Sequence, residues 1–282
     1  MAATTRRVSR SNCFHARQTT TPAPPPGSCQ GGKWTSLIAP SESVIAYQTS
    51  RNPVPLTAVA SILQRDTSAI ATLGSSGLRC PADLDGKVYA SYDARFEDGI
   101  VRNMVRNDGG KGDFTAVKIG RLDIWEMLQK GEANATWVFM PWEGVKAERE
   151  GMALNVFKME DFGIPYGYTP LILAHKEDIE ARSQAYRAFM QVTAEGYQEA
   201  VAKPSETAVF LCQNVEHPDF EDSDFIEASL RALAPAQLTP DGQWGRMEAA
   251  VWQRFTNWLV EKDLLPSSPA VDPEKLFTGE LL

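Results

Sequence analysis

Apolar residues occur in two different spacings along this chain from residue 33 onward. Short apolar runs, rich in β-branched and small residues, predict strands, whereas apolar residues spaced three or four apart predict helices. Because the two kinds of segment follow one another, the pattern is typical of an α/β protein with largely parallel sheets. The predicted strands cover residues 36–39, 56–63, 69–73, 87–91, 114–119, 135–140, 156–157 and 170–174.

The best-marked helix is predicted after Asp93, a residue type that caps helix N-termini. Phe96, Ile100 and Met104 recur at four-residue steps, so they share one face, and Asp108 is expected to end the helix. Beyond residue 175 the chain is mostly helical, with two apolar faces that we expect in the core. These faces carry Tyr186, Phe189, Met190, Thr193, Tyr197 and Val201, and Met247, Val251, Trp252, Phe255, Trp258 and Leu259.

The junction after the strand at 135–140 has the features of a ligand site. Pro141 is preorganised for a first helical turn, whose unpaired N–H groups project outward, and the helix is expected to end at Gly151. At the carboxyl edge of a parallel sheet, Trp142 could stack on a flat ring while Glu143 accepts its N–H donors. A structural role fits equally well, with Trp142 in the core and Glu143 offsetting the helix dipole. Spacing alone leaves both interpretations open.

Charge and composition exclude several classes of partner. The net charge is −8, and no basic block occurs beyond the N-terminal region, so we expect no nucleic-acid partner. No apolar stretch approaches the roughly 20 residues of a membrane-spanning helix, so no transmembrane segment is predicted. The four cysteines form no CxxC pair and lack a histidine at ligand spacing, so no metal site is predicted.

The first 32 residues differ in composition from the rest of the chain. They are poor in large apolar side chains, and no acidic residue occurs before Glu42, so we expect a disordered leader. The arginine- and serine-rich composition resembles an organellar transit peptide, and no apolar core of a secretory signal is present. We therefore expect a cytoplasmic or organellar location, the alternative being a non-native or mis-started N-terminus. The leader's arginines are Arg6, Arg7, Arg10 and Arg17.

Catalytic motifs are mostly absent. The chain has no Gly-x-Ser-x-Gly elbow, no phosphate-binding Gly-x-x-x-x-Gly-Lys-Ser/Thr loop and no dinucleotide-binding Gly-x-Gly-x-x-Gly. His175 and His217 have no nucleophile or metal ligand at diagnostic spacing, so we interpret them as surface or capping residues. The sequence therefore lacks the motifs that would predict a hydrolase, a nucleotidase or a dehydrogenase.

An ordered set of segments resembles type II periplasmic-binding-protein domains. Within that superfamily the chain is most similar to the branch that binds thiamine-pyrimidine precursors, which also contains the fungal hydroxymethylpyrimidine phosphate synthases. The likeness spans about residues 32–265. Family members begin with further elements, so the first lobe is expected to lack its N-terminal strand and helix. The segments are 38–43, 58–63, 83–87, 135–144 and 163–170.

The resemblance implies two α/β lobes joined by two chain crossings, with a ligand bound between them. One lobe would comprise residues 33–78 and 169–265, the other residues 79–168, and residues 266–282 would form a tail. The resemblance places the ligand-binding residues in four regions. These are the rim of the first lobe, the start of a helix in the second lobe, the end of the strand before Pro141 and the neighbourhood of the chain crossing after residue 165. The residues are Pro40, Ser41, Ser43, Asp93, Arg95, Trp142, Glu143, Tyr166 and Tyr168.

Two functional classes follow from the resemblance. The first is a non-catalytic binding protein for a pyrimidine-like small molecule, with no cofactor; a transporter subunit or a second copy stays open as its partner. The alternative is an enzyme like the synthases, which consume one of their own histidines and use pyridoxal phosphate and iron. Ser43 stands at the histidine position, no cysteine cluster lies within 166–174, and the segment of the cofactor lysine is absent. Binding is therefore favoured over catalysis.

Overall fold

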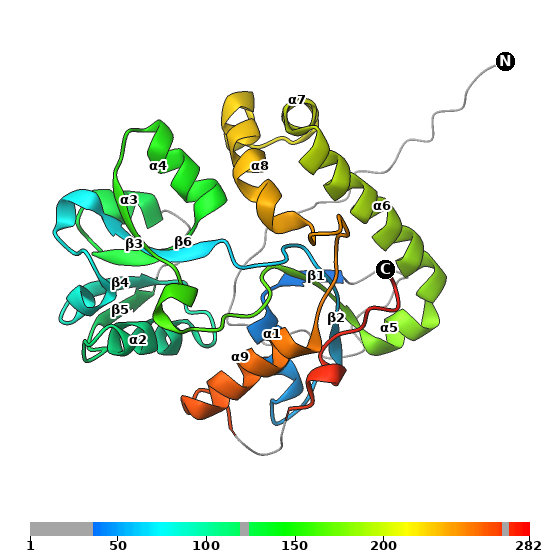
Figure 1. Ribbon diagram of the computed structural model, residues 1–282, viewed down its shortest axis with the longest axis horizontal. Helices are drawn as coiled ribbons and strands as arrows, with labels where there is room; N and C mark the ends of the chain where they lie inside the picture. Colours follow the sequence, from blue (N-terminus) through cyan, green and yellow to red (C-terminus); the bar gives the residue numbers. More distant parts are fainter. Residues whose placement is uncertain (1–35, 119–123, 267–270) are drawn as a thin grey trace.

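The computed structural model describes residues 36–118, 124–266 and 271–282, and arranges them as two sheets with helices around each (Figure 1). The first sheet has the strand order β1-β8-β2, and the second has the order β5-β4-β6-β3-β7. The chain passes between the sheets after β2 and again before β8, so the molecule has two lobes connected by two crossings. The predicted leader at residues 1–32 lies outside the described residues.

The first sheet is antiparallel throughout, which corrects the expectation of largely parallel sheets. Its strands are β1 (Ser36–Ala39), β2 (Leu56–Ser61) and β8 (Leu171–His175). The central strand β8 opposes both neighbours, with Ser36 opposite Ala174 and Leu56 opposite His175. The chain order explains this direction, because β8 is the strand that returns from the other lobe and enters the sheet from the opposite end.

The second sheet is mixed. Strand β4 runs parallel to β5 and β6, whereas β3 runs antiparallel to β6 and β7. The expected lobe boundary at residue 78 would leave β3 in the first lobe, but β3 pairs inside the second sheet because the chain already crosses over residues 62–67. The strands are β3 (Ser68–Leu73), β4 (Val88–Ser91), β5 (Thr115–Lys118), β6 (Ala135–Phe139) and β7 (Leu154–Phe157).

The helices divide between the lobes. Those of the second lobe are α2 (Glu97–Asn107), α3 (Ile124–Gln129) and α4 (Val145–Arg149), with η1 (Gly74–Ser76), η2 (Pro81–Leu84), the π-helical turn η3 (Met140–Gly144) and η4 (Glu160–Phe162). Those of the first lobe are α1 (Ser41–Gln48), α5 (Lys176–Ala181), α6 (Ser183–Ala202), α7 (Pro204–Asn214), α8 (Ser223–Gln237) and α9 (Ala249–Glu261), with η5 (Pro218–Phe220) and η6 (Pro273–Lys275).

Helix α2 confirms the predicted face, because Ile100 and Met104 are fully buried. Its start differs from the prediction. The helix begins at Glu97, and Asp93 lies before it in the left-handed region, with φ of 60°. Asp93 is therefore no helix cap; its carboxylate instead pairs with Lys118 at 2.6 Å. The backbone N–H of Ala94 is satisfied by Glu97, whose side chain turns back over the helix start.

The two predicted apolar faces beyond residue 175 are partly confirmed. On α6, Tyr186 and Met190 are buried against the first sheet, but Phe189 is 47% exposed. On α9, Trp252, Phe255, Trp258 and Leu259 are all buried. The helical period predicts which residues share a face, but the width of the buried stripe depends on how closely the sheet approaches the helix.

The segment predicted as a tail packs onto the first lobe. The backbone of Leu276 accepts a hydrogen bond from Ala58 N, and Thr278 N donates to Ala58 O, both at 2.9 Å. Phe277 stacks on Trp252 with 6.0 Å between ring centroids, and Leu281 is 3% exposed. The chain's last residues therefore cover the outer edge of β2.

Candidate ligand-binding site

The two chain crossings border a cavity of about 660 Å³ between the lobes. The first crossing contributes Asp66, and the second contributes Lys158 and Tyr166. Pro141 of η3, just after β6, lies on the second-lobe side, and Arg254 of α9 lies on the first-lobe side. Both lobes and both crossings therefore supply walls to one space.

The Tyr166 side chain connects the lobes at this cavity. Its ring lies 5.3 Å from the ring of Trp137 in β6 and 5.3 Å from that of Phe255 in α9. Its hydroxyl donates a 2.6 Å hydrogen bond to Oε2 of Glu42, a residue of α1 that is 3% exposed. Burial raises the pKa of the Glu42 carboxyl to about 7, although the Tyr166 hydrogen bond opposes that rise.

Two further carboxyl groups lie near Tyr166. Asp66 accepts hydrogen bonds from the backbone N–H and the hydroxyl of Ser68, at 2.9 and 2.7 Å, and burial raises its pKa to about 6. Glu97 is 2% exposed, and burial also raises its pKa. It accepts a 2.8 Å hydrogen bond from the Tyr89 hydroxyl.

The negative charges of Glu42, Asp66 and Glu97 add to burial in raising the pKa of the Tyr166 hydroxyl. These three residues, which we call the acidic cluster, come from α1, the first crossing and the start of α2. Partly desolvated carboxyl groups with raised pKa accept hydrogen bonds strongly once they ionise. The arrangement suits a ligand that is rich in N–H donors or carries positive charge.

Trp142 makes an aromatic contact between the lobes. It lies on η3 of the second lobe, and its ring meets Phe225 of α8 edge-on at 4.7 Å between centroids. Phe220 lies at 6.1 Å, and Val145 belongs to the same apolar cluster. Beside it, Arg149 of α4 pairs with Asp222 at 2.6 Å. In this arrangement the Trp142 ring is occupied by protein partners.

The Glu143 side chain bonds back to the end of the preceding strand, β6. Its Oε2 accepts a 2.8 Å hydrogen bond from Phe139 N, which ends β6, and burial raises its pKa. Burial, and after it the charge of Glu143, raises the pKa of the Tyr92 hydroxyl. Because the helix begins with the π-helical turn η3, Glu143 lies inside that turn.

The remaining predicted site residues are spread around this region. Ser41 is buried, its N–H donates to Tyr168 O at 2.9 Å, and its hydroxyl has no partner among the described residues. Ser43, two residues further along α1, is half-buried. Tyr168 is 4% exposed, and its hydroxyl accepts from Glu248 N at 3.0 Å. Arg95 is exposed.

The acidic cluster itself was missed by sequence reasoning. Glu42 lies inside one of the segments that carry the family resemblance, between Ser41 and Ser43, but an acid in a first helical turn is usually explained by the helix dipole. The same explanation covers Glu97. Asp66 follows a strand without any motif. Only their convergence from distant segments identifies them.

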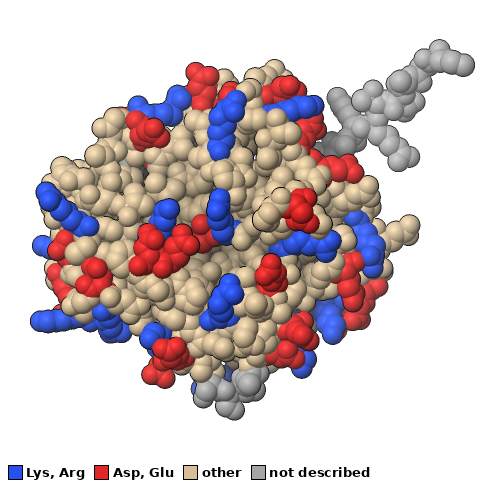
Figure 2. All heavy atoms as spheres, in the orientation of Figure 1, with Lys and Arg blue, Asp and Glu red and all other residues tan. Residues whose placement is uncertain are grey.

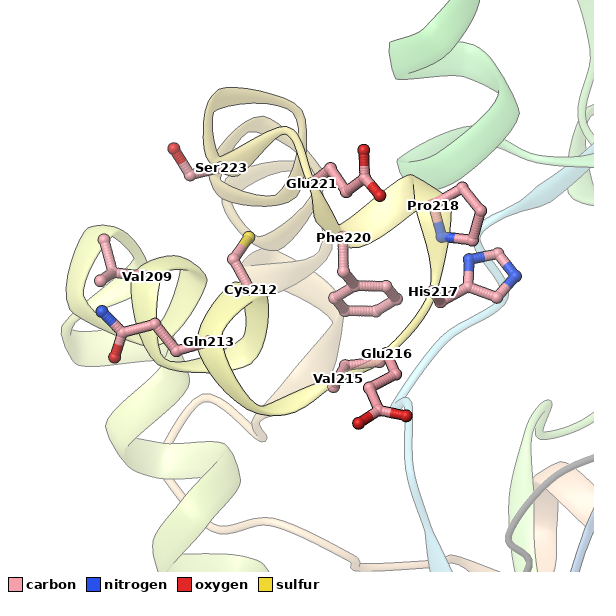
Figure 3. Close-up of a pocket in the computed structure, with 10 residues that line it drawn as sticks. All are labelled: Val209, Cys212, Gln213, Val215, Glu216, His217, Pro218, Phe220, Glu221 and Ser223. Atoms are coloured by element: carbon pink, nitrogen blue, oxygen red, sulfur yellow. The ribbon is translucent and has the colours of Figure 1, made fainter.

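A second hollow, of about 740 Å³, lies between α7 and η5 and contains a cysteine and a histidine (Figure 3). Figure 3 shows the Cys212 thiol and the His217 ring on opposite sides of the Phe220 ring, so the two do not form a nucleophile–base pair. His217 accepts a hydrogen bond from Asp219 N at 3.2 Å and caps η5, as the sequence predicted. In the described part of the chain, no group of three potential ligand residues could hold a metal.

The fold is that of the type II periplasmic binding proteins. The periplasmic nitrate-binding protein NrtA from Synechocystis superimposes with a TM-score of 0.63, covering 90% of this chain and 74% of that protein at 14% identity. The family model described as NMT1/THI5 like matches residues 22–207, and the chain belongs to that family. The predicted resemblance and two-lobed fold are confirmed.

Two curated relatives match most of the chain. The formylaminopyrimidine-binding protein of Halalkalibacterium halodurans is 23% identical over 214 residues, which are 75% of this chain and 65% of that protein. A Haemophilus influenzae protein, provisionally named for thiamine biosynthesis, is 27% identical over 232 residues, covering 80% and 70% respectively. This chain thus spans about two thirds of the length of these relatives.

The comparisons correct the expected location. A cytoplasmic or organellar location was inferred from the leader, and the comparisons contradict it, because the solved proteins that share the fold include ones named as periplasmic. Among the described residues, no helix has both the length and the apolarity to cross a bilayer. Figure 2 shows acidic and basic side chains interspersed on the visible face.

Proposed function

We propose that this chain is a non-catalytic binding protein for a thiamine-pyrimidine-like heteroaromatic molecule, held between the two lobes. The observation that carries the proposal is the acidic cluster around Tyr166, beside a cavity bordered by both chain crossings. An aminopyrimidine presents exocyclic N–H donors and a ring nitrogen that can be protonated. Asp66 lines the cavity and offers such a ligand an acceptor, and Glu42 is joined to the cavity wall through the Tyr166 hydroxyl.

Lobe closure gives the binding its physical basis. A ligand that contacts both lobes stabilises the closed form in proportion to the contacts that only that form provides. Tyr166 packs on Trp137 of one lobe and on Phe255 of the other, so a ligand beside it is close to both. The printed name of the Halalkalibacterium relative, a formylaminopyrimidine-binding protein, supports this class of ligand.

We propose further that binding requires no cofactor and no chemical step by the protein. The synthase alternative consumes a histidine of the protein, and Ser43 occupies that position in the resemblance. A hydroxyl group cannot supply imidazole ring atoms to a product. Ligand contact by Ser41, Ser43, Trp142 and Glu143 stays a prediction, because none of the four lines the cavity at the crossings.

Calorimetry with formylaminopyrimidine tests the proposal. We expect Glu42→Gln to weaken binding by about tenfold or more, because a charge-assisted hydrogen bond contributes about 1.5–3 kcal/mol. In the wild-type chain near pH 6.5, binding should release protons, since a ligand donor favours the ionised form of a carboxyl whose pKa is about 7. Titration in two buffers of different ionisation enthalpy measures that release.

Glu195→Gln, an exposed acid of α6, is the matched control and should bind normally. Unchanged affinity in the Glu42→Gln variant would remove the acidic cluster from the site. Formation of the thiamine pyrimidine after incubation with pyridoxal phosphate, iron and oxygen would overturn the non-catalytic assignment.

A further inference from the structure

Two cationic side chains in the wall of the cavity at the chain crossings have no bonded partner among the described residues. Lys158 follows β7 on the second crossing, and Arg254 lies on α9 of the first lobe. Both residues are exposed, so a ligand in the cavity can reach them. Within the part of the chain that the structure describes, neither side chain forms a hydrogen bond or an ion pair.

The other charged groups of this wall do not neutralise the two cations. They are Arg65, Asp66 and Glu160. Arg65 donates a 2.9 Å hydrogen bond to the carbonyl of Pro235 in α8. Glu160 is exposed and forms no ion pair with Lys158, although only one residue separates them in the sequence. The wall therefore has three cations against two carboxylates, whereas the whole chain has a net charge of −8. Such a local excess of positive charge attracts anions.

The two cations belong to elements of different lobes. Lys158 directly follows a strand of the second lobe, and Arg254 lies on a helix of the first. Two like charges in the wall of one space of about 660 Å³ repel each other, and more strongly as lobe closure excludes water. A bound anion removes this repulsion and attracts both side chains, so it favours the closed form. The uncharged polar residues of the wall cannot replace that effect; they are Gln64, Thr67, Ser68, Tyr166 and Tyr168.

We propose that the ligand of this cavity carries an anionic group, a phosphate or a carboxylate, which Lys158 and Arg254 bind together. The inference rests on the proposed function and narrows its ligand class to a pyrimidine-like ring with an anionic substituent. The planar guanidinium of Arg254 can bind two oxygens of the anion at once, and the Lys158 ammonium group acts as a point charge. Asp66 repels the anion and therefore serves the N–H donors of the ring.

Calorimetry on the full chain tests the proposal with two pyrimidines of nearly equal shape and different charge. We expect 4-amino-2-methylpyrimidine-5-carboxylate to bind about three- to tenfold more tightly than the corresponding carboxamide at low salt. The preference should shrink as salt is added, because both cations are exposed and screened. The phosphate ester of the matching hydroxymethyl compound, measured against the free alcohol, shows which of the two anions the site prefers.

Variants identify the residues that bind the anion. Lys158→Gln and Arg254→Gln should each reduce the preference for the anionic compound and leave the affinity for the carboxamide unchanged. Arg187→Gln, an exposed arginine of α6 outside the cavity wall, is the matched control and should keep the preference. Because each variant is judged by the ratio of two affinities, a partial loss of folded protein does not affect the result.

Equal affinities for the anionic and neutral compounds in the wild-type chain would overturn the proposal, and so would a preference that both cavity variants keep. If the carboxamide binds as well as either anion, the proposed pyrimidine site stands and the anion site fails. Benzoate and benzamide repeat the comparison without a pyrimidine. A preference for benzoate that depends on Lys158 and Arg254, with no pyrimidine bound, would support the anion site and contradict the pyrimidine. Failure of every compound to bind would contradict both.

Discussion

The Tyr166 hydroxyl donates a 2.6 Å hydrogen bond to Oε2 of Glu42 and so joins the second chain crossing to helix α1. The two residues are 124 positions apart in the sequence. Glu42 is buried, and the Tyr166 ring lies between an aromatic residue of each lobe. Tyr166 also lines the cavity at the crossings, so this bond lies beside the proposed ligand site.

Removing the hydroxyl should destabilise the fold. In Tyr166→Phe the Glu42 carboxyl loses its side-chain partner while it stays buried, so we expect the free energy of unfolding to fall by about 1–3 kcal/mol. Urea denaturation at pH 7 measures the change. Tyr197→Phe, another partly buried tyrosine, is the control and should change stability less. Equal losses of unfolding free energy in the two variants would show that the Tyr166–Glu42 hydrogen bond contributes no more to stability than the Tyr197 hydroxyl does.

Stability should depend on pH through Glu42. The pKa of this carboxyl is about 7 in the folded chain and 4.5 without the protein environment. Between these values the folded state holds a proton that the unfolded state has lost, so stability falls as the pH rises from about 4.5 to 7. The loss is on the order of 3 kcal/mol.

Urea denaturation at several pH values from 4.5 to 7.5 should therefore give a smaller decline for Glu42→Gln than for the wild-type chain. Asp66, with its pKa raised to about 6, acts in the same direction and should leave a residual decline in the variant. Parallel pH profiles for the two proteins would contradict the assignment of the decline to Glu42.

The contact between Trp142 and Phe225 should favour the closed arrangement of the lobes. A double-mutant cycle with Trp142→Ala and Phe225→Ala is expected to give a coupling energy of about 0.5–1.5 kcal/mol in urea denaturation. Both single variants should weaken pyrimidine binding and increase the radius of gyration in X-ray scattering, because each frees one lobe from the other. If only Trp142→Ala weakened binding, Trp142 would contact the ligand directly.

The last residues should be essential for stability. Removing residues 271–282 uncovers the β2 edge and takes away Leu276 and Leu281, each of which contributes about 1.5–3 kcal/mol by burial. We expect the melting temperature to fall by more than about 5 °C. Removing residues 1–30, which carry few large apolar side chains, should change it by no more than about 2 °C. Similar falls for the two truncations would contradict this difference.

The pattern of residues along the chain was sufficient to predict most of the helices and strands and the family. The strand at Ser36–Ala39 follows from a short apolar run and the buried face of α2 from the spacing of apolar residues, because both patterns are properties of residues close in the sequence. The family resemblance rests on ordered segments, and it is confirmed by the match over residues 22–207. These features need no knowledge of which segments meet in space.

Tertiary structure alone decided the strand directions, the partners of Trp142 and the acidic cluster. The period of a helix or strand shows which side is buried, but not what lies against it. Trp142 contacts Phe225, and Glu42 accepts a hydrogen bond from Tyr166, although the partners are far apart in the sequence. The raised pKa of Glu42 likewise arises from loss of water, and water is excluded only when α1, the crossings and α9 pack together.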